Sequence, residues 1–265
     1  MIRRVTDKTA AALIIGNEVL TGKVQEANVA HLARMLFDLG VTLRRVVVCP
    51  DEVDVIAEDL NALRRAHDWV FTSGGIGPTH DDVTVKAVAE AFGRPVVRSA
   101  ELEALLRHHL ERKGREVTEA DLRMADVVQG ARLIRRADVV WPTLVLDNVY
   151  VLPGVPEIFR LKLEALRDDL GMGRTKGFVG MAVYTRCEES SIAHVLERLA
   201  AAYPRVTIGS YLKWRGEDYR VKVTFDGRDA DEVAAAADAF VAAIPASDFV
   251  RRVHSSSRQR SSIDP

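Results

Sequence analysis

The sequence has very little cysteine. Among 265 residues only Cys49 and Cys187 occur, and they stand far apart in the chain. Two cysteines are too few for the disulfide framework of a small secreted protein, and they do not suggest a zinc site. Because an unpaired cysteine is usually a small buried hydrophobe, we expect both thiols to be free and buried.

Long apolar runs and a strong net charge are also absent. No segment approaches the roughly 18 apolar residues of a membrane-spanning helix, and residues 1–7 lack the apolar core of a signal peptide. The 37 basic residues nearly balance the 38 acidic ones, so the formal charge is -1, which argues against non-specific binding of nucleic acid. We therefore expect a cytoplasmic protein with no nucleic-acid and no membrane partner.

The composition that remains is that of a globular protein. Hydrophobic residues make up 48% of the chain and charged residues 28%, which excludes a disordered or fibrous chain. Since a single hydrophobic core stops growing at roughly 250 to 300 residues, a chain of 265 residues is expected to form one main domain and a smaller second one.

The first part of the chain alternates between strand and helix patterns. Apolar runs at residues 9–15, 45–49 and 68–72 are separated by segments with helical spacing at 28–39 and 53–66. This βαβαβ order predicts parallel strands with right-handed crossovers. Further helices are expected at 84–92, 100–113, 119–125 and 156–170, and extended runs at 131–134 and 149–152. The predicted fold class is α/β, with a three-layer parallel-sheet domain over residues 1–172.

The second part of the chain has a different order of elements. Strand and helix patterns follow one another as βαββαβ, the ferredoxin-like order, which predicts a small α+β domain over residues 173–254. Three glycines in residues 171–177 indicate a linker at the boundary. The segment 255–265 is rich in serine and arginine, so we predict a disordered tail.

A glycine-rich loop is the main candidate for a functional site. It follows the 68–72 run and precedes the helix expected from residue 84, so it lies at the carboxyl end of a parallel strand, where crevices open in α/β sheets. Glycines let main-chain amides approach a ligand, and a helix N-terminus attracts anions, so phosphate is the expected ligand. On its own, the Gly-Gly-x-Gly-Pro segment is equally consistent with a tight turn. The expected phosphate-binding residues are Thr72, Ser73, Gly74, Gly75, Gly77, Pro78, Thr79 and Thr84.

Acidic residues near this loop favour a cation at the site. Asp81 and Asp82 would repel phosphate unless a cation lay between them. Asp82 is also well placed to cap the following helix, but capping would leave Asp81 unexplained. Glu18 follows the first strand and Asp51 the second, so both are expected at the same edge of the sheet. We predict a metal held by Glu18, Asp51 and Asp82, with Asp51, Asp81 and Asp82 as catalytic residues.

The loop after the last expected strand of the first domain completes the candidate site. It reads Pro153-Gly154-Val155-Pro156-Glu157 and is expected at the same edge of the sheet. Pro153, Gly154 and Pro156 would form the wall opposite the glycine-rich loop. The general base stays open, because His80 beside the aspartate pair is equally well explained as a loop histidine.

Together these loops resemble a known family. They are similar to the molybdopterin-binding-like domain of the competence/damage-inducible protein A family in residues 16–22, Asp51, residues 73–84 and residues 152–157. The resemblance covers the first domain and continues more weakly into the second, where it is most similar to the N-terminal half of eukaryotic FAD synthase. Residues 140–144 replace the Gly-Thr-Ala-Pro-Gly segment usual in the bacterial family and are similar to the FAD synthase version.

The resemblance implies a nucleotide pyrophosphatase. Members of the family hydrolyse ADP-ribose, or FAD to FMN and AMP, with a divalent metal ion (Mg, Mn or Co) and potassium. Similar molybdopterin adenylyltransferases have functional aspartates at the positions that match Asp51 and Asp82. The replaced segment at 140–144 favours a dinucleotide such as FAD.

Two other functions fit the same loops. One is a module that binds a pterin or nucleotide without turnover, and the other is adenylyl transfer to molybdopterin in molybdenum cofactor biosynthesis. In each case the expected partner is a small-molecule nucleotide or pterin, and the protein is expected to be a homo-oligomer, either a dimer or a trimer. We expect neither the amidase nor the reductase-like adenylyltransferase activity of the longer relatives, because no segment of this sequence matches those domains.

Overall fold

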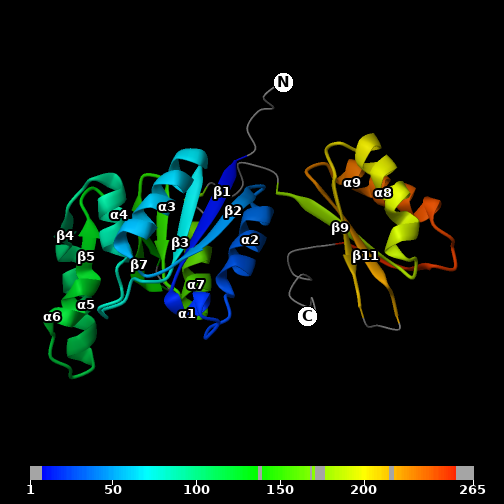
Figure 1. Ribbon diagram of the computed structural model, residues 1–265. Helices are drawn as coiled ribbons and strands as arrows, with labels where there is room; N and C mark the ends of the chain where they lie inside the picture. Colours follow the sequence, from blue (N-terminus) through cyan, green and yellow to red (C-terminus); the bar gives the residue numbers. More distant parts are fainter. Residues whose placement is uncertain (1–7, 137–138, 168, 171–176, 215–217, 255–265) are drawn as a thin grey trace. The chain divides into compact units, whose positions relative to one another are not determined.

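The chain folds into two units, each built on one main sheet (Figure 1). The computed structural model describes residues 8–136, 139–167, 169–170, 177–214 and 218–254. The first unit comprises residues 1–37 and 41–174, and the second comprises 38–40 and 175–265. Most of the expected linker, residues 171–176, and the expected tail, residues 255–265, lie outside the described residues.

The first unit is built on a six-stranded sheet in the order β2-β1-β3-β8-β7-β6. Its first four strands are parallel, as expected: β2 (Thr42–Cys49), β1 (Thr9–Ile15), β3 (Trp69–Ser73) and β8 (Val149–Leu152). β7 (Val139–Leu146) runs against both of its neighbours, β8 and β6 (Arg132–Arg136). The predicted parallel sheet is thus confirmed for four neighbouring strands, and the sequence analysis missed β7, which makes the sheet mixed at this edge.

A tight turn explains why β7 is antiparallel. Only Asp147 and Asn148 separate β7 from β8, and two residues can join antiparallel strands but not parallel ones. Asp147 has a positive φ of 49°, which suits the short turns of β-hairpins.

Helices cover both faces of this sheet, so the unit has three layers (Figure 1). On one face, α3 (Val53–Ala66) and α4 (Thr84–Phe92) share a core with Ala11, Leu13 and Ile15 of β1. Because side chains alternate along a strand, Ala10, Ala12 and Ile14, also buried, point to the other face. That face packs against α2 (Asn28–Asp38) and α7 (Pro156–Leu166), whose buried residues include Leu32, Leu36, Phe159 and Leu163.

The chain between α4 and β6 forms a small lobe. It contains the following elements: β4 (Val96–Arg98), α5 (Ala100–Arg112), α6 (Glu119–Leu122), a short 3-10 helix (Arg123–Ala125) and β5 (Asp126–Val128). Leu106, Leu110 and Leu122 form its core, and Trp141 of β7 packs against them. The lobe is thereby attached to the start of β7.

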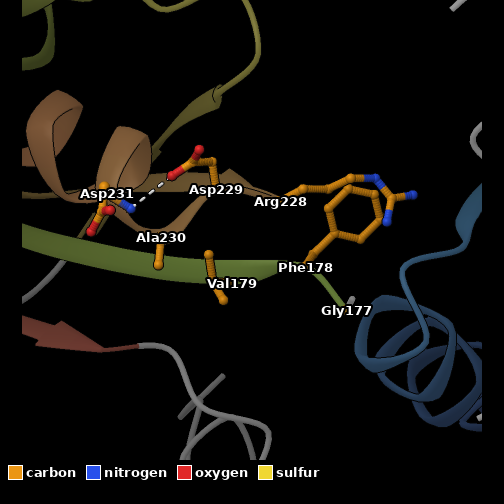
Figure 2. Close-up of a pocket in the computed structure, with 7 residues that line it drawn as sticks. All are labelled: Gly177, Phe178, Val179, Arg228, Asp229, Ala230 and Asp231. Carbon is orange, nitrogen blue, oxygen red and sulfur yellow. Dashed lines mark hydrogen bonds between the residues drawn. The ribbon is translucent and has the colours of Figure 1, made fainter. Parts of the chain in front are cut away.

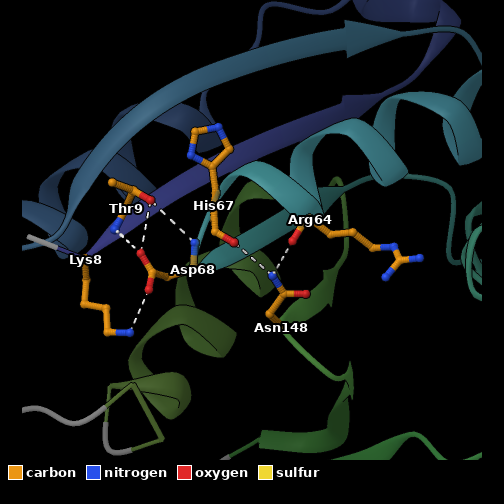
Figure 3. Close-up of polar contacts among 6 residues, drawn as sticks. All are labelled: Lys8, Thr9, Arg64, His67, Asp68 and Asn148. Atoms are coloured by element: carbon orange, nitrogen blue, oxygen red, sulfur yellow. Dashed lines mark hydrogen bonds and ion pairs between the residues drawn. The ribbon is translucent and has the colours of Figure 1, made fainter. Parts of the chain in front are cut away.

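Polar contacts tie together the amino ends of the central strands (Figure 3). The Asp68 carboxylate accepts hydrogen bonds from Thr9 N at 2.9 Å and from Lys8 Nζ at 2.7 Å. Burial opposes ionisation of Asp68, but these bonds outweigh it and lower the pKa of its carboxyl. At the same edge, Asn148 Nδ2 donates to the carbonyl oxygens of Arg64 at 2.9 Å and His67 at 3.0 Å. These contacts hold the amino edge of the sheet in register.

The second unit has the expected βαββαβ order. Its elements are β9 (Val179–Thr185), α8 (Glu189–Ala202), β10 (Thr207–Leu212), β11 (Val221–Gly227), α9 (Ala230–Ala243) and β12 (Phe249–His254). The sheet is antiparallel in the order β10-β11-β9-β12, so the first and third strands of the unit are central. Both helices pack their buried residues against β9 and β11 in one core. The ferredoxin-like prediction is confirmed.

Both cysteines are free and buried, as predicted. Burial is the main reason why the pKa of the Cys49 thiol is raised to about 12, so this thiol stays protonated at neutral pH. Over the described residues, no helix is both long enough and apolar enough to cross a membrane.

Candidate functional site

The four parallel strands of the first unit end side by side. Ile15 of β1 pairs with Cys49 of β2, and Ser73 of β3 pairs with Ile14 of β1 and with Leu152 of β8. The loops that begin at Gly16, Pro50, Gly74 and Pro153 therefore emerge at one edge of the sheet, and this edge is where every candidate site residue was expected.

The glycine-rich loop lies against the end of β1 and against the loop that follows β8. Gly74 N donates to Leu152 O at 3.1 Å, and a Cβ at Gly154 would lie 3.4 Å from Gly74 Cα. Gly74 has a φ of 111°, and a Cβ placed on it would overlap the carbonyl oxygen of Ile15. Only glycine fits this position, because a side chain would strain the backbone and collide with fixed main-chain atoms.

The start of α4 faces this loop without a side-chain cap. Thr84, the first helical residue, is fully buried, and it donates through N to Gly75 O at 3.0 Å and through Oγ1 to Gly74 O at 2.9 Å. Val83 occupies the N-cap position and provides no side-chain hydrogen bond, and the first turn has no acidic residue. The positive end of the helix dipole is therefore not neutralised locally, which favours an anion at this point.

Asp82 does not cap α4, so that interpretation was wrong. Its Oδ2 accepts hydrogen bonds from Thr79 N at 2.7 Å and Thr79 Oγ1 at 2.5 Å, which folds the loop back on itself. A Cβ at Gly77 would lie 2.6 Å from the same oxygen, so the carboxylate sits against the glycine-rich loop. Asp81 is exposed. The hydroxyl of Thr79, and to a smaller extent His80, lower the pKa of the Asp81 carboxyl.

The expected phosphate-binding residues fall into two groups. Thr72, Ser73, Gly74, Thr84 and Pro153 are buried and form or support the base of the loop. Those that reach the surface are Gly75, Gly77, Pro78, Thr79, Gly154 and Pro156, the last being the first residue of α7. The second group is the one that a ligand can touch.

The loop after β2 places Asp51 against the start of the loop after β1, which carries Glu18. Asp51 Oδ2 accepts a hydrogen bond from Asn17 N at 2.8 Å, at the start of the short helix α1 (Asn17–Leu20). Glu18 folds back toward Gly16, where an added Cβ would lie 2.6 Å from Glu18 Oε1. Within the described part of the chain, no three His, Cys, Asp or Glu side chains are arranged to hold a metal ion. Glu18, Asp51 and Asp82 therefore do not form a preassembled three-ligand site.

Asn28 is a residue of this edge that the sequence analysis missed. Its side chain is 4% exposed, and its Nδ2 donates to Ser73 Oγ at 2.9 Å and to Gly154 O at 2.8 Å. Its Oδ1 has no hydrogen-bond partner among the described residues. Asn28 thus links the start of α2 to the ends of β3 and β8. Asparagine is common at helix starts as an N-cap, so the local sequence does not show that this side chain instead bonds distant residues.

We expect Asn28→Ala to lower the free energy of unfolding by about 1 to 3 kcal/mol, because the buried Ser73 Oγ and the part-buried Gly154 O would both lose a donor. The same change should weaken binding of a phosphate ligand at this edge, since the loops after β3 and β8 lose their link. Urea denaturation and titration with inorganic pyrophosphate measure the two effects. Asn148→Ala is the matched control, because it removes a similar double donation at the opposite edge of the sheet. Equal loss of binding in the two variants would contradict a specific role for Asn28.

A hollow lies in the second unit, at the start of α9 (Figure 2). The Arg228 guanidinium stacks on the Phe178 ring at 4.5 Å from its centroid. Asp229 Oδ1 accepts hydrogen bonds from Asp231 N at 3.0 Å and Glu232 N at 3.2 Å. The first amides of this helix are thus already bound to a carboxylate, and Asp231 adds negative charge, so this hollow does not suit phosphate.

The fold and this edge define a class of protein. A three-layer α/β domain carries a glycine-rich loop and an uncapped helix start at the carboxyl ends of its parallel strands, with acidic residues in the adjoining loops, and a ferredoxin-like unit follows it. Residues 11–170 match the family described as "Probable molybdopterin binding domain", and residues 177–253 match that described as "FAD synthase, middle domain". The chain belongs to the molybdopterin-binding-domain family, which confirms the resemblance drawn from its loops.

Individual relatives agree with this assignment. A protein of Archaeoglobus fulgidus is 32% identical over 85% of this chain and 93% of its own length. A "Probable FAD synthase" of Caenorhabditis elegans is 29% identical over 86% of this chain but only 48% of its own length, so the chain spans about half of that protein. The solved structure of CinA from Thermoplasma acidophilum, described as of unknown function, is 30% identical, with a TM-score of 0.56 over 62% of this chain and 98% of that chain.

Proposed function

We propose that the first unit is a metal-dependent nucleotide pyrophosphatase that hydrolyses a dinucleotide, either FAD to FMN and AMP or ADP-ribose. The observation that carries the proposal is the uncapped N-terminus of α4 behind the glycine-rich loop, with the Asp82 carboxylate against that loop. A helix start alone would suit any anion. Carboxylates in the adjoining loops suit a diphosphate that arrives with a cation.

In the proposed reaction the glycine-rich loop binds the phosphate, and the carboxylates orient the cation and the diphosphate. The amides of residues 75–77 and the first turn of α4 would hold one phosphate, since Gly74 N and the Thr79 hydroxyl already donate to Leu152 O and to Asp82. Asp82 is held in place by Thr79, and Asp51 by Asn17 N, so both carboxylates have a defined direction before a ligand binds. Such preorganisation lowers the cost of stabilising charge that develops on the diphosphate.

The residues present suit a hard divalent cation. Mg²⁺ and similar ions prefer oxygen ligands and commonly take one or two protein carboxylates, with substrate phosphates and water completing the shell. A preassembled set of three protein ligands is therefore not required, and Asp51 and Asp82, with Glu18 beside Asp51, provide the donors. When bound, the cation would neutralise the diphosphate and lower the pKa of an attacking water. Potassium remains part of the proposal.

A panel of dinucleotides tests the proposal. The protein would be incubated with FAD, ADP-ribose and related dinucleotides with Mg²⁺, Mn²⁺ or Co²⁺, and released AMP would be measured by chromatography. We expect AMP from at least one of FAD and ADP-ribose, and its loss on addition of a chelator. Tight binding of a dinucleotide without any product, with each of the metals, would show that the protein is a binding module and not a pyrophosphatase.

Adenylyl transfer to molybdopterin is the second candidate, because residues 11–170 match a domain described as binding molybdopterin. The same incubation with molybdopterin and ATP distinguishes it: an adenylylated pterin with no hydrolysis of FAD or ADP-ribose would favour transfer. The proposed dimer or trimer can be measured by light scattering on the same samples.

A further inference from the structure

Lys162 of α7 carries a buried amino group that the proposed chemistry does not use. The residue is 2% exposed, and its Nζ donates to Trp141 O and Pro142 O, both at 2.7 Å, and to Thr143 Oγ1 at 3.5 Å. These partners are neutral. Burial lowers the pKa of the ammonium to about 8. Lysine is almost never fully buried without a paired charge, and an apolar side chain would fill this position at less cost.

The three acceptors occupy one short segment at the edge of the candidate site. β7 is antiparallel to β8, with Leu144 opposite Val151 and Leu146 opposite Val149. Residues before Leu144 therefore lie beside the carboxyl end of β8, where the wall loop 153–155 begins. α7 starts immediately after that loop, at Pro156. Lys162 thus connects the helix that follows the wall loop with the strand that runs alongside it.

The segment 141–143 also joins the candidate site to the small lobe. The Trp141 side chain packs against Leu106, Leu110 and Leu122 of that lobe, while its carbonyl oxygen accepts from Lys162. Pro142 has no N–H and cannot help to anchor the strand by donating. The Lys162 ammonium therefore supplies the hydrogen bonds that fix the carbonyl side of this segment.

We propose that Lys162 is a positioning residue that holds segment 141–143 against the wall loop 153–155 and so sets the affinity of the site for a dinucleotide. The identity of the ligand rests on the proposed function, but the positioning does not require turnover. A shift of about 1 Å in a wall that contacts the ligand can change binding or rate by up to a hundredfold.

Lys162 is the group around this segment that titrates near pH 8. β7 contributes no ionisable side chain, and Glu157, Arg160 and Glu164 of α7 are exposed. On β6, Arg132 forms an ion pair with Asp169 and Arg135 forms one with Glu101, and Arg136 is the remaining ionisable residue of that strand. On β8, the Tyr150 hydroxyl donates a hydrogen bond to Asp169. Burial raises the pKa of Tyr150, and arginines stay charged, so these groups keep their charge between pH 7 and pH 9.5.

The test compares wild type, Lys162→Met and Lys162→Gln, with exposed Lys113→Met as the control. The dissociation constant for FAD would be measured by calorimetry at pH 7 and pH 9.5, and KM and kcat for AMP release at pH 7. Lys162→Met keeps the bulk and removes the donors, so we expect about a tenfold rise in the dissociation constant and in KM with little change in kcat. Lys162→Gln retains an N–H donor and should recover part of the affinity. Wild type and Lys113→Met should bind FAD more weakly at pH 9.5, and Lys162→Met should show no such change.

The pH dependence of the free energy of unfolding tests the burial of the Lys162 ammonium independently of ligand binding. Because the folded state lowers the pKa of Lys162, the unfolded chain binds more protons between pH 8 and the ordinary lysine value of about 10.5, so stability contributed by this group rises with pH in that window. Urea midpoints of wild type should therefore rise with pH relative to those of Lys162→Met.

Two results would overturn the proposal. The first is equal affinity for FAD in Lys162→Met and in wild type at both pH values. The second applies if Lys162→Met does not fold: it is an affinity of wild type for FAD that does not change between pH 7 and pH 9.5. If no protein releases AMP but the affinities change as described, the hydrolytic function is wrong and the positioning role stands.

Discussion

Gly74→Ala is expected to lower the free energy of unfolding of the first unit by about 3 kcal/mol or more. Two costs add at this position. The backbone has a φ of 111°, which L side chains rarely adopt, and the new methyl group would overlap the carbonyl oxygen of Ile15. That oxygen belongs to the end of a buried central strand, so it cannot move aside. Thermal and urea unfolding followed by circular dichroism would measure the loss.

The effect should extend to ligand binding, because Gly74 also donates to Leu152 O and lies against Gly154. A displaced loop would no longer present its amides to an anion. Gly114→Ala is the matched control, since Gly114 has a φ of 65° and open space where the methyl group would go. It should cost about 1 kcal/mol and leave binding unchanged. If Gly74→Ala were no more destabilising than the control, the close approach of the loop to β1 would be wrong.

Asp82→Ala is expected to reduce AMP release by at least about a hundredfold while changing the free energy of unfolding by no more than about 1 kcal/mol. The carboxylate would be lost from the glycine-rich loop, together with a donor for the proposed cation. Among the described residues, the hydrogen bonds to its carboxylate are the two from Thr79, in an exposed turn. Initial rates across metal concentrations, together with a melting curve, would measure both effects.

Asp121→Ala provides a closely matched control. Asp121 Oδ2 accepts hydrogen bonds from Thr118 N at 3.0 Å and Thr118 Oγ1 at 2.6 Å, the same pair of contacts that Asp82 makes with Thr79. It lies in the small lobe, in the capping box of α6. We expect a similar change in stability and an unchanged rate. A rate loss shared by both variants would mean that the turn, and not the carboxylate, is what the reaction needs.

Much of the fold follows from local pattern. The short apolar runs that become β1, β3 and β8, and the helical spacing between them, predict parallel strands and crossovers without reference to distant residues. The same reasoning places the glycine-rich loop and Asp51 at one edge. It fails for β7, because Pro142 interrupts the pattern of a strand and the direction of β7 depends on the turn at Asp147.

The candidate site is harder to predict from sequence, because it depends on the positions of the functional groups at the ends of side chains. Local sequence is compatible with Asp82 as a cap or as a partner of Thr79, and only the fold of the loop selects the second. Likewise, Glu18, Asp51 and Asp82 share an edge by topology, but their side chains do not assemble into one cluster.

The sequence by itself determined the parallel core of the first unit, the class of each unit and the position of the glycine-rich loop, because strand alternation, helical spacing and glycine conformations are properties of neighbouring residues. Only the tertiary structure decided that Asn28 holds Ser73 and Gly154, and that Lys162 is buried on the carbonyls of β7. Those contacts join residues far apart in the chain, and their energies depend on desolvation in a packed interior, which no local pattern encodes.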